Sequence, residues 1–172
     1  METSIQNTRL FPLKKIEIHT TLEAYDDMSE LDSTVHSLMQ QSIAARHKAY
    51  APYSNFTVGC AILLENGEVV TGNNQENAAY PSGLCAERVA IYAAGAQYPG
   101  VAIKMMALTA SPIDDSLTIP VPPCGACRQA IAEYENKQKS FIPIYFMGAS
   151  GTVVKSDSLK DLLPLIFDKS YL

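Results

Sequence analysis

Three cysteines and one glutamate have the spacing of a zinc site that performs hydrolysis. Glu87 lies two positions after Cys85, and Cys124 and Cys127 stand three positions apart directly after a double proline. Three thiolates can bind one zinc ion and leave its fourth tetrahedral position free for water, which distinguishes catalytic zinc from closed structural zinc. The sequence therefore predicts one catalytic Zn²⁺ per chain, bound by Cys85, Cys124 and Cys127.

Glu87 and Arg88 supply the other chemistry that this ligand set requires. A carboxyl group beside the metal can take a proton from water and return it to a leaving group if a dry pocket raises its pKa. We expect Glu87 to be this proton carrier. Zinc with three thiolates has a formal charge of about −1, which opposes the acidification of water. Two helix N-termini and the guanidinium of Arg88, as a donor to a thiolate, would offset that charge.

Each motif also has a simpler interpretation. A Cys-x-x-Cys pair alone can be redox-active or one half of a structural zinc knuckle. A non-enzymatic zinc module would need a fourth ligand or would lack a proton carrier. Cys60 lies in an apolar run and is expected to be a core residue, and none of the three histidines has ligand spacing. Disulfides are disfavoured, because clustered cysteines without an export signal fit metal or redox chemistry better.

The composition predicts one globular domain that binds small molecules. The chain has 172 residues, 47% of them hydrophobic, and a formal charge of −5. An acidic chain has no basic field to gather phosphates, so we expect no nucleic-acid partner. The longest apolar runs are far shorter than the ~20 residues of a membrane helix, and the first nine residues lack an export signal. We therefore expect no membrane association and a cytoplasmic protein.

The periodicity of the chain predicts helices and strands that alternate. Apolar residues from Val35 to Ala49 have helical spacing, and the Asn66-Gly67 turn joins two strands into a hairpin. Ser158 begins a short last helix with a capping-box-like pattern. The remaining expected helices are 85–96 and 124–135, and the expected strands are 58–64, 68–71, 105–110, 141–147 and 152–154.

This order predicts an α/β fold with a mixed five-stranded sheet covered by helices. Both cysteine motifs are expected in the opening turns of helices at one edge of the sheet, where open α/β sheets usually hold ligands. Residues 16–22 alternate between apolar and polar types, so they could form an edge strand or an ordered arm. We divide the chain into residues 1–30, an N-terminal arm or extra strand, and residues 31–172, the catalytic domain.

The motifs resemble those of the cytidine deaminase family, in its small homotetrameric form with three zinc cysteines. The resemblance covers residues 42–167. It rests on Cys-Ala-Glu-Arg at 85–88, Pro-Cys-Gly-Ala-Cys-Arg-Gln at 123–129 and three further stretches in order, which are 50–56, 74–80 and Leu162-Leu163-Pro164. It implies the three-layer sandwich of that family.

The resemblance also implies the residues that bind the substrate. Phe56 would stack on the pyrimidine ring, and Asn74 and Glu76 would hydrogen-bond the ribose. The backbone at Ala86 would contact the base edge. Tyr80 and Phe167 would close the pocket of a neighbouring subunit, with Ile166 as the alternative to Phe167.

The implied reaction is hydrolysis of the C4 amino group of cytidine or deoxycytidine, for pyrimidine salvage, in a homotetramer with shared active sites. Two other enzymes remain as alternatives, a deaminase of the nucleoside antibiotic blasticidin S and an editor of cytosines in polynucleotides. The long first 30 residues and the polar loop at 114–122 depart from the compact family pattern.

Overall fold

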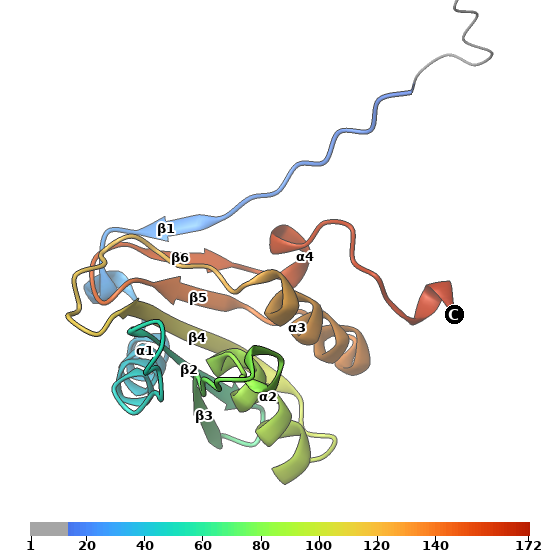
Figure 1. Ribbon diagram of the computed structural model, residues 1–172. Coiled ribbons are helices and arrows are strands. Elements are labelled where there is room, and N and C mark those ends of the chain that lie inside the picture. The colour runs from blue at the N-terminus through green and yellow to red at the C-terminus, as the bar shows by residue number, and fades with distance from the viewer. Residues whose placement is uncertain (1–13) are drawn as a thin grey trace, which may run out of the picture.

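The computed structural model describes residues 14–172, in which one mixed sheet of six strands is covered by helices on both faces (Figure 1). The strand order is β1-β6-β5-β4-β2-β3. Among the described strands, β4 and β5 are parallel neighbours, and the other pairs are antiparallel. The strands are β1 (Glu23–Tyr25), β2 (Phe56–Leu64), β3 (Val69–Asn73), β4 (Ile103–Pro112), β5 (Ile144–Met147) and β6 (Val153–Ser156).

The expected fold class is confirmed, but the sheet has six strands and not five. The additional strand is β1, whose residues Glu23 to Tyr25 pair with Lys155 to Val153 of β6. The alternating segment 16–22 lies just before β1, in no strand. The alternation of apolar and polar residues predicted extended chain there. In the antiparallel register of β1 and β6, residues 16–21 lie beyond Ser156, where β6 ends, so they have no neighbouring strand to pair with.

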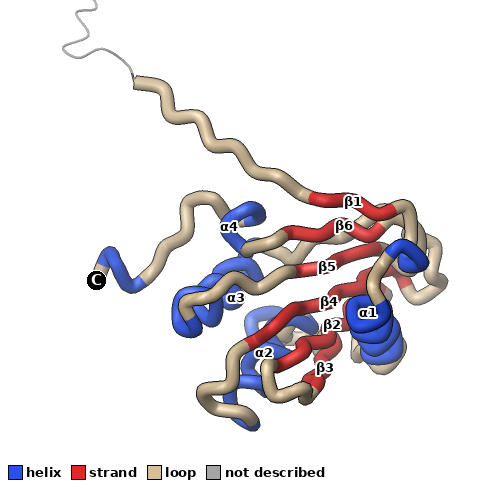
Figure 2. Tube along the Cα trace, turned by 180° about the vertical axis from the view of Figure 1, so that it is seen from behind, coloured by secondary structure: helices blue, strands red, loops and turns tan. Residues whose placement is uncertain are grey.

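Four α-helices of the described chain cover the sheet. Figures 1 and 2 show α1 on one face and α2 and α3 on the other. The two faces bury separate clusters, one around Val35, Leu38 and Met39 of α1 and one around Ala90 of α2 and Ile131 of α3. None of the helices described in residues 14–172 is long and apolar enough to span a membrane. The helices are α1 (Ser33–Arg46), α2 (Ala86–Gln97), α3 (Gly125–Gln138) and α4 (Leu159–Leu162).

Two glycines allow helices to lie directly on the strands. A Cβ on Gly59 of β2 would overlap the backbone of α1 at Ser42 and Arg46. A Cβ on Gly72 of β3 would lie 2.6 Å from both the carbonyl oxygen of Ala86 and the amide nitrogen of Ala90 in α2. Because real Cβ atoms do not approach backbone so closely, only glycine permits this contact. Gly72 thereby helps set the position of α2, which carries the proposed proton carrier.

Candidate metal centre and substrate pocket

The three predicted metal ligands meet at the N-termini of two helices. Cys85 is the N-cap of α2, Cys124 is the N-cap of α3, and Cys127 lies in the first turn of α3. The two cysteines that were expected to open these helices are thus N-caps with extended backbone, one residue before each helix begins. The Sγ atoms of Cys85 and Cys124 are 3.8 Å apart, and those of Cys124 and Cys127 are 3.5 Å apart.

This cluster fits a single metal ion. All three sulfurs lie within 4.8 Å of one another, and neither N-cap sulfur is used to cap its own helix. The helix N-termini add partial positive charge, which favours thiolates. Thiolate ligands and three-fold coordination suit zinc with one open position. The donor set in residues 14–172 is therefore suitable for Zn²⁺, as expected from the sequence.

Hydrogen bonds and a nearby cation stabilise a thiolate at Cys85. The hydrogen bond from Cys127, followed by those from Arg88 and Cys124, lowers the pKa of Cys85 to about 5. The same interaction and burial raise the pKa of Cys127. The Nη2 atom of Arg88 lies 3.5 Å from the Cys85 sulfur, and this bond raises the pKa of the guanidinium, which remains charged.

Glu87 is buried beside the cysteines without a partner for one of its oxygens. Its exposed fraction is 4%, and Oε2 makes no hydrogen bond to any residue of 14–172. Burial is the main cause that raises the pKa of this carboxyl, and the negative charge of Cys85 adds to it. An unpartnered buried carboxyl oxygen costs free energy unless something binds it. The oxygen is therefore available to a substrate or water in the cavity that Glu87 lines.

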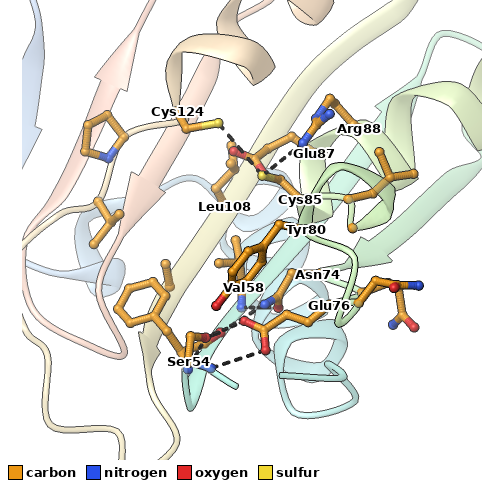
Figure 3. Close-up of a pocket in the computed structure, with 18 residues that line it drawn as sticks. Ser54, Val58, Asn74, Glu76, Tyr80, Cys85, Glu87, Arg88, Leu108 and Cys124 are labelled. Carbon is orange, nitrogen blue, oxygen red and sulfur yellow. Dashed lines mark hydrogen bonds between the residues drawn. The ribbon is translucent and has the colours of Figure 1, made fainter. Parts of the chain in front are cut away.

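A cavity of about 450 Å³ extends from the cysteines to the loop before β2. In Figure 3, Cys85, Cys124, Glu87 and Arg88 lie at one end, and Ser54, Asn74 and Glu76 lie at the other. Phe56 and Tyr80 also line this cavity. Its size and mixed apolar and polar lining suit a small molecule. The predicted site residues thus line one cavity, apart from Cys127, Ala86 and Phe167. Cys127 is buried, and its sulfur lies within 4.8 Å of those of Cys85 and Cys124.

Ala86 and Phe167 lie outside the lining of this cavity. Ala86 is completely buried at the start of α2, so any contact with a ligand would come from its backbone. Phe167 is 60% exposed and stacks on Tyr171, with ring centroids 5.6 Å apart. Tyr80 lines the cavity but is 79% exposed. The rings of Tyr80 and Phe167 are therefore accessible to another chain.

Asn74 and Glu76 also organise the pocket wall. The Asn74 side chain accepts a hydrogen bond from the Val58 amide at 2.8 Å and donates one to the Phe56 carbonyl at 2.9 Å. Glu76 accepts hydrogen bonds from the amides of Tyr53 and Ser54 and from the Ser54 hydroxyl. The hydroxyl of Ser54 and then the Tyr53 amide lower the pKa of Glu76.

Several lining residues were not identified from the sequence. Ser54 falls within the matching stretch 50–56, and Val58 and Leu108 fall within expected strands, with no predicted role in the site. The alternation of side chains along a strand could have identified Val58 and Leu108, because every second residue points to the same face of the sheet. Val58 shares a face of β2 with Phe56, and the β2–β4 register places Val58 opposite Ala110 and Cys60 opposite Leu108. Cys60 itself is buried in the core, as expected.

Comparisons with known proteins agree on one family. Residues 32–142 match the family model described as the cytidine and deoxycytidylate deaminase zinc-binding region. The cytidine deaminase of Sporosarcina psychrophila is 41% identical over 136 residues, which cover 78% of this chain and 92% of the relative. The cytidine deaminase of Halalkalibacterium halodurans is 46% identical over 98 residues, which cover 56% of this chain and 68% of the relative.

Solved structures give the same result. The crystal structure of cytidine deaminase from Burkholderia pseudomallei superposes with a TM-score of 0.67 at 40% identity, and the match covers 77% of this chain and 98% of that one. The cytidine deaminase from Mycobacterium tuberculosis superposes with a TM-score of 0.60 at 31% identity, over 81% of this chain and 99% of that one.

Proposed function

Because this chain belongs to the cytidine deaminase family, we propose that it is a zinc enzyme that hydrolyses the C4 amino group of cytidine and deoxycytidine. The products are uridine or deoxyuridine and ammonia. The observation that carries this function is the unpartnered, buried oxygen of Glu87 next to three convergent cysteine sulfurs. The family match of residues 32–142 supports 31–172 as the catalytic domain.

The three thiolates of Cys85, Cys124 and Cys127 would hold the zinc ion. Zinc bound there would supply Lewis acidity, which makes water a better nucleophile at neutral pH. Arg88 donates to Cys85 and offsets the negative charge of the ligand set. Second-sphere donors of this kind orient a ligand and tune its metal.

Glu87 would move the protons of the reaction. Its carboxylate would take one proton from the attacking water and deliver it to N3 of the base. It would then take the second proton of that water, from the new C4 hydroxyl, and deliver it to the departing amine as the C4 carbonyl forms. Burial raises the pKa of the Glu87 carboxyl. A carboxyl with a raised pKa holds a proton more readily than an exposed one, which suits a group that must both accept and deliver protons.

Phe56, Asn74 and Glu76 would bind the nucleoside. Phe56 offers an aromatic face to the pyrimidine, and the backbone at Ala86 would contact the base edge. After its bond to Phe56, the Asn74 amide has one N–H left to donate, and the Glu76 carboxylate has lone pairs left after three hydrogen bonds. One remaining donor and one remaining acceptor suit adjacent ribose hydroxyls.

We further propose a homotetramer in which Tyr80 and Phe167 reach a neighbouring pocket. The exposure of both rings supports this assignment, and Ile166 is less suitable because it packs against the core of its own chain. Three of the four free cysteines converge as metal ligands, which suits a reducing compartment such as the cytoplasm. We propose that the enzyme acts there, in pyrimidine salvage.

Loss of the cytidine absorbance band on addition of the purified protein tests this function directly. We expect turnover of cytidine and deoxycytidine, abolition by a zinc chelator and recovery on addition of Zn²⁺. Parallel samples with blasticidin S and with single-stranded DNA separate the two rival deaminases. A zinc-loaded protein that leaves cytidine and deoxycytidine unchanged would show that the proposal is wrong.

A further inference from the structure

The segment 14–22 leaves the body of the protein as extended chain before β1, without a partner strand among the described residues. Figures 1 and 2 show it projecting beyond β1, away from the sheet. Within the described chain, none of its backbone groups is hydrogen-bonded. Its side chains are solvent-exposed, including Ile16 at 87%, Ile18 at 50% and Leu22 at 44%. Three exposed aliphatic side chains in one short segment indicate a surface that is covered by something else.

The three aliphatic residues lie on one face of the strand. Side chains alternate along extended backbone, so Ile16, Ile18 and Leu22 share a face with Ala24. Tyr25 lies on the opposite face, where it packs against the cluster beneath α1. The segment is therefore amphipathic in register with β1, and it extends the outermost strand of the sheet.

The outer edge of β1 is also free, because β1 ends the strand order of the described sheet. Exposed strand edges with unpaired N–H and C=O groups pair readily with another strand. Charge indicates which strand fits. The segment begins with Lys14 and Lys15 and is followed by Glu23, Asp26 and Asp27. A sequence that is basic at one end and acidic at the other is complementary to its own antiparallel copy.

We propose that residues 14–26 pair antiparallel with the same residues of a second copy of this chain, about a two-fold axis at Thr20. This pairing joins two six-stranded sheets edge to edge. The two-fold axis makes the interface isologous, so each contact occurs twice. The facing pairs are Lys14 with Asp26, Ile16 with Ala24, Ile18 with Leu22, and Thr20 with Thr20.

The opposite face of the ribbon contains one kind of like-charge contact, Glu17 with Glu23, which occurs twice. Lys155 offsets it, since its Nζ lies 2.7 Å from the carboxylate of Glu23 and β6 remains in place beside β1. The Asp26 carboxylate has no hydrogen-bond donor among the described residues, so it is free to meet Lys14. The pairing thus brings the exposed aliphatic side chains into contact with one another and places opposite charges together at both ends of the ribbon.

The interface lies outside residues 32–142, which match the family. It also uses neither Tyr80 nor Phe167, so it is separate from the contacts assigned to the proposed tetramer and from the residues assigned to the proposed function. Light scattering on a size-exclusion column will compare the full chain with a variant that lacks residues 1–22. We expect the deletion to lower the number of chains per particle by at least one half and to leave zinc content and turnover per chain unchanged. The same number of chains per particle in the two proteins would overturn the proposal.

A matched pair of cysteine variants tests the axis. Cross-strand neighbours have Cβ atoms about 4.5–5.5 Å apart, which is close to what a disulfide requires. Thr20→Cys places the two cysteines opposite each other, so we expect a disulfide-linked pair on a non-reducing gel. Thr21→Cys faces position 19 of the second copy, two residues away from the other cysteine, so we expect no disulfide. Cross-linking of both variants to the same extent, or of neither, would contradict antiparallel pairing about Thr20.

A charge exchange tests the facing pair at the ends of the ribbon. Lys14→Glu is expected to weaken the association, because it places a carboxylate of each copy against Asp26 of the other. The double variant Lys14→Glu with Asp26→Lys is expected to restore the wild-type mass. Failure of the second substitution to restore it would exclude the proposed register.

Discussion

The guanidinium of Arg46 donates to the carboxylate of Asp115 at 2.6 Å, and this ion pair joins the end of α1 to the loop after β4. Arg46 is fully buried, and its Nη1 also lies 3.4 Å from the hydroxyl of Thr57. Thr57 follows Phe56 directly, and the Asp115 loop leads to Val121 and Pro122 of the pocket. One buried cation therefore connects two walls of the substrate cavity.

Removal of the charge at residue 115 should destabilise the protein. Asp115→Asn keeps the size of the side chain and tolerates the left-handed backbone found there (φ 57°), but it leaves the buried Arg46 without a counter-charge. A hydrogen bond to a charged group contributes about 2 kcal/mol, so we expect a loss of about that size in the free energy of unfolding. Urea denaturation measures it. Asp114→Asn, at the neighbouring exposed carboxylate, is the control and should cost far less.

Replacement of Glu87 should separate metal binding from catalysis. Glu87→Gln retains the shape of the side chain and cannot carry protons, so turnover of cytidine should fall by roughly 10²- to 10⁴-fold, the usual contribution of a general acid–base group. Elemental analysis should still find one zinc per chain. Loss of the metal in this variant would instead identify Glu87 as a ligand.

Arg88 should affect the metal more than the substrate. Arg88→Ala removes the donor to Cys85, and outer-sphere partners of metal ligands typically contribute roughly 10- to 100-fold to affinity or activity. We expect a lower affinity for zinc, measured by competition with a chelator, or a lower kcat. Arg88→Lys retains the charge and should recover part of the loss. Wild-type metal content and rate in Arg88→Ala would contradict the assigned role.

The Ser54 hydroxyl should set the titration of Glu76. It is the largest cause of the lowered pKa of this carboxyl, so Ser54→Ala should raise that pKa toward the ordinary value near 4.5. A carboxyl with a depressed folded-state pKa stabilises the fold above its unfolded-state pKa, and the contribution is lost as the pH falls through the folded-state value. The loop at 50–55 should therefore loosen at a higher pH in the variant.

The carbon chemical shift of the Glu76 carboxyl, followed by NMR from neutral pH into the acid range, measures this change. Ser116→Ala provides the control, since Ser116 bonds to the distant Asp114 and not to Glu76. An unchanged pKa of Glu76 in Ser54→Ala would mean that the backbone amides alone hold the carboxylate.

The sequence predicted the metal site well because its chemistry depends on few residues at short spacing. Two cysteines within one helical turn have sulfurs that can meet, and the glutamate two residues after Cys85 lies in the first turn of α2. Helical periodicity likewise located α1, α2 and α3 to within a few residues. These patterns are local, so they require no knowledge of tertiary contacts.

Features that depend on contacts between distant residues were not predictable in the same way. The ion pair of Arg46 and Asp115 joins residues 69 positions apart, and no local pattern indicates it. The strand expected from Phe141 begins at Ile144, because Pro143 has no amide hydrogen to donate to a neighbouring strand. Residues 16–22 have a strand pattern but no neighbour among the described residues of their own chain.

The separation of the metal ligands in the chain has a consequence for how the protein is made. Cys85 and Cys124 are 39 residues apart, and β4 lies between them. During synthesis, Cys85 leaves the ribosome seconds before Cys127, since chains grow by about 5–20 residues per second. The thiol of Cys85 therefore stays reduced and without its partner ligands until α3 has emerged. Capture of the ion is thus a late event, and a chain that stops before Cys127 cannot complete the site.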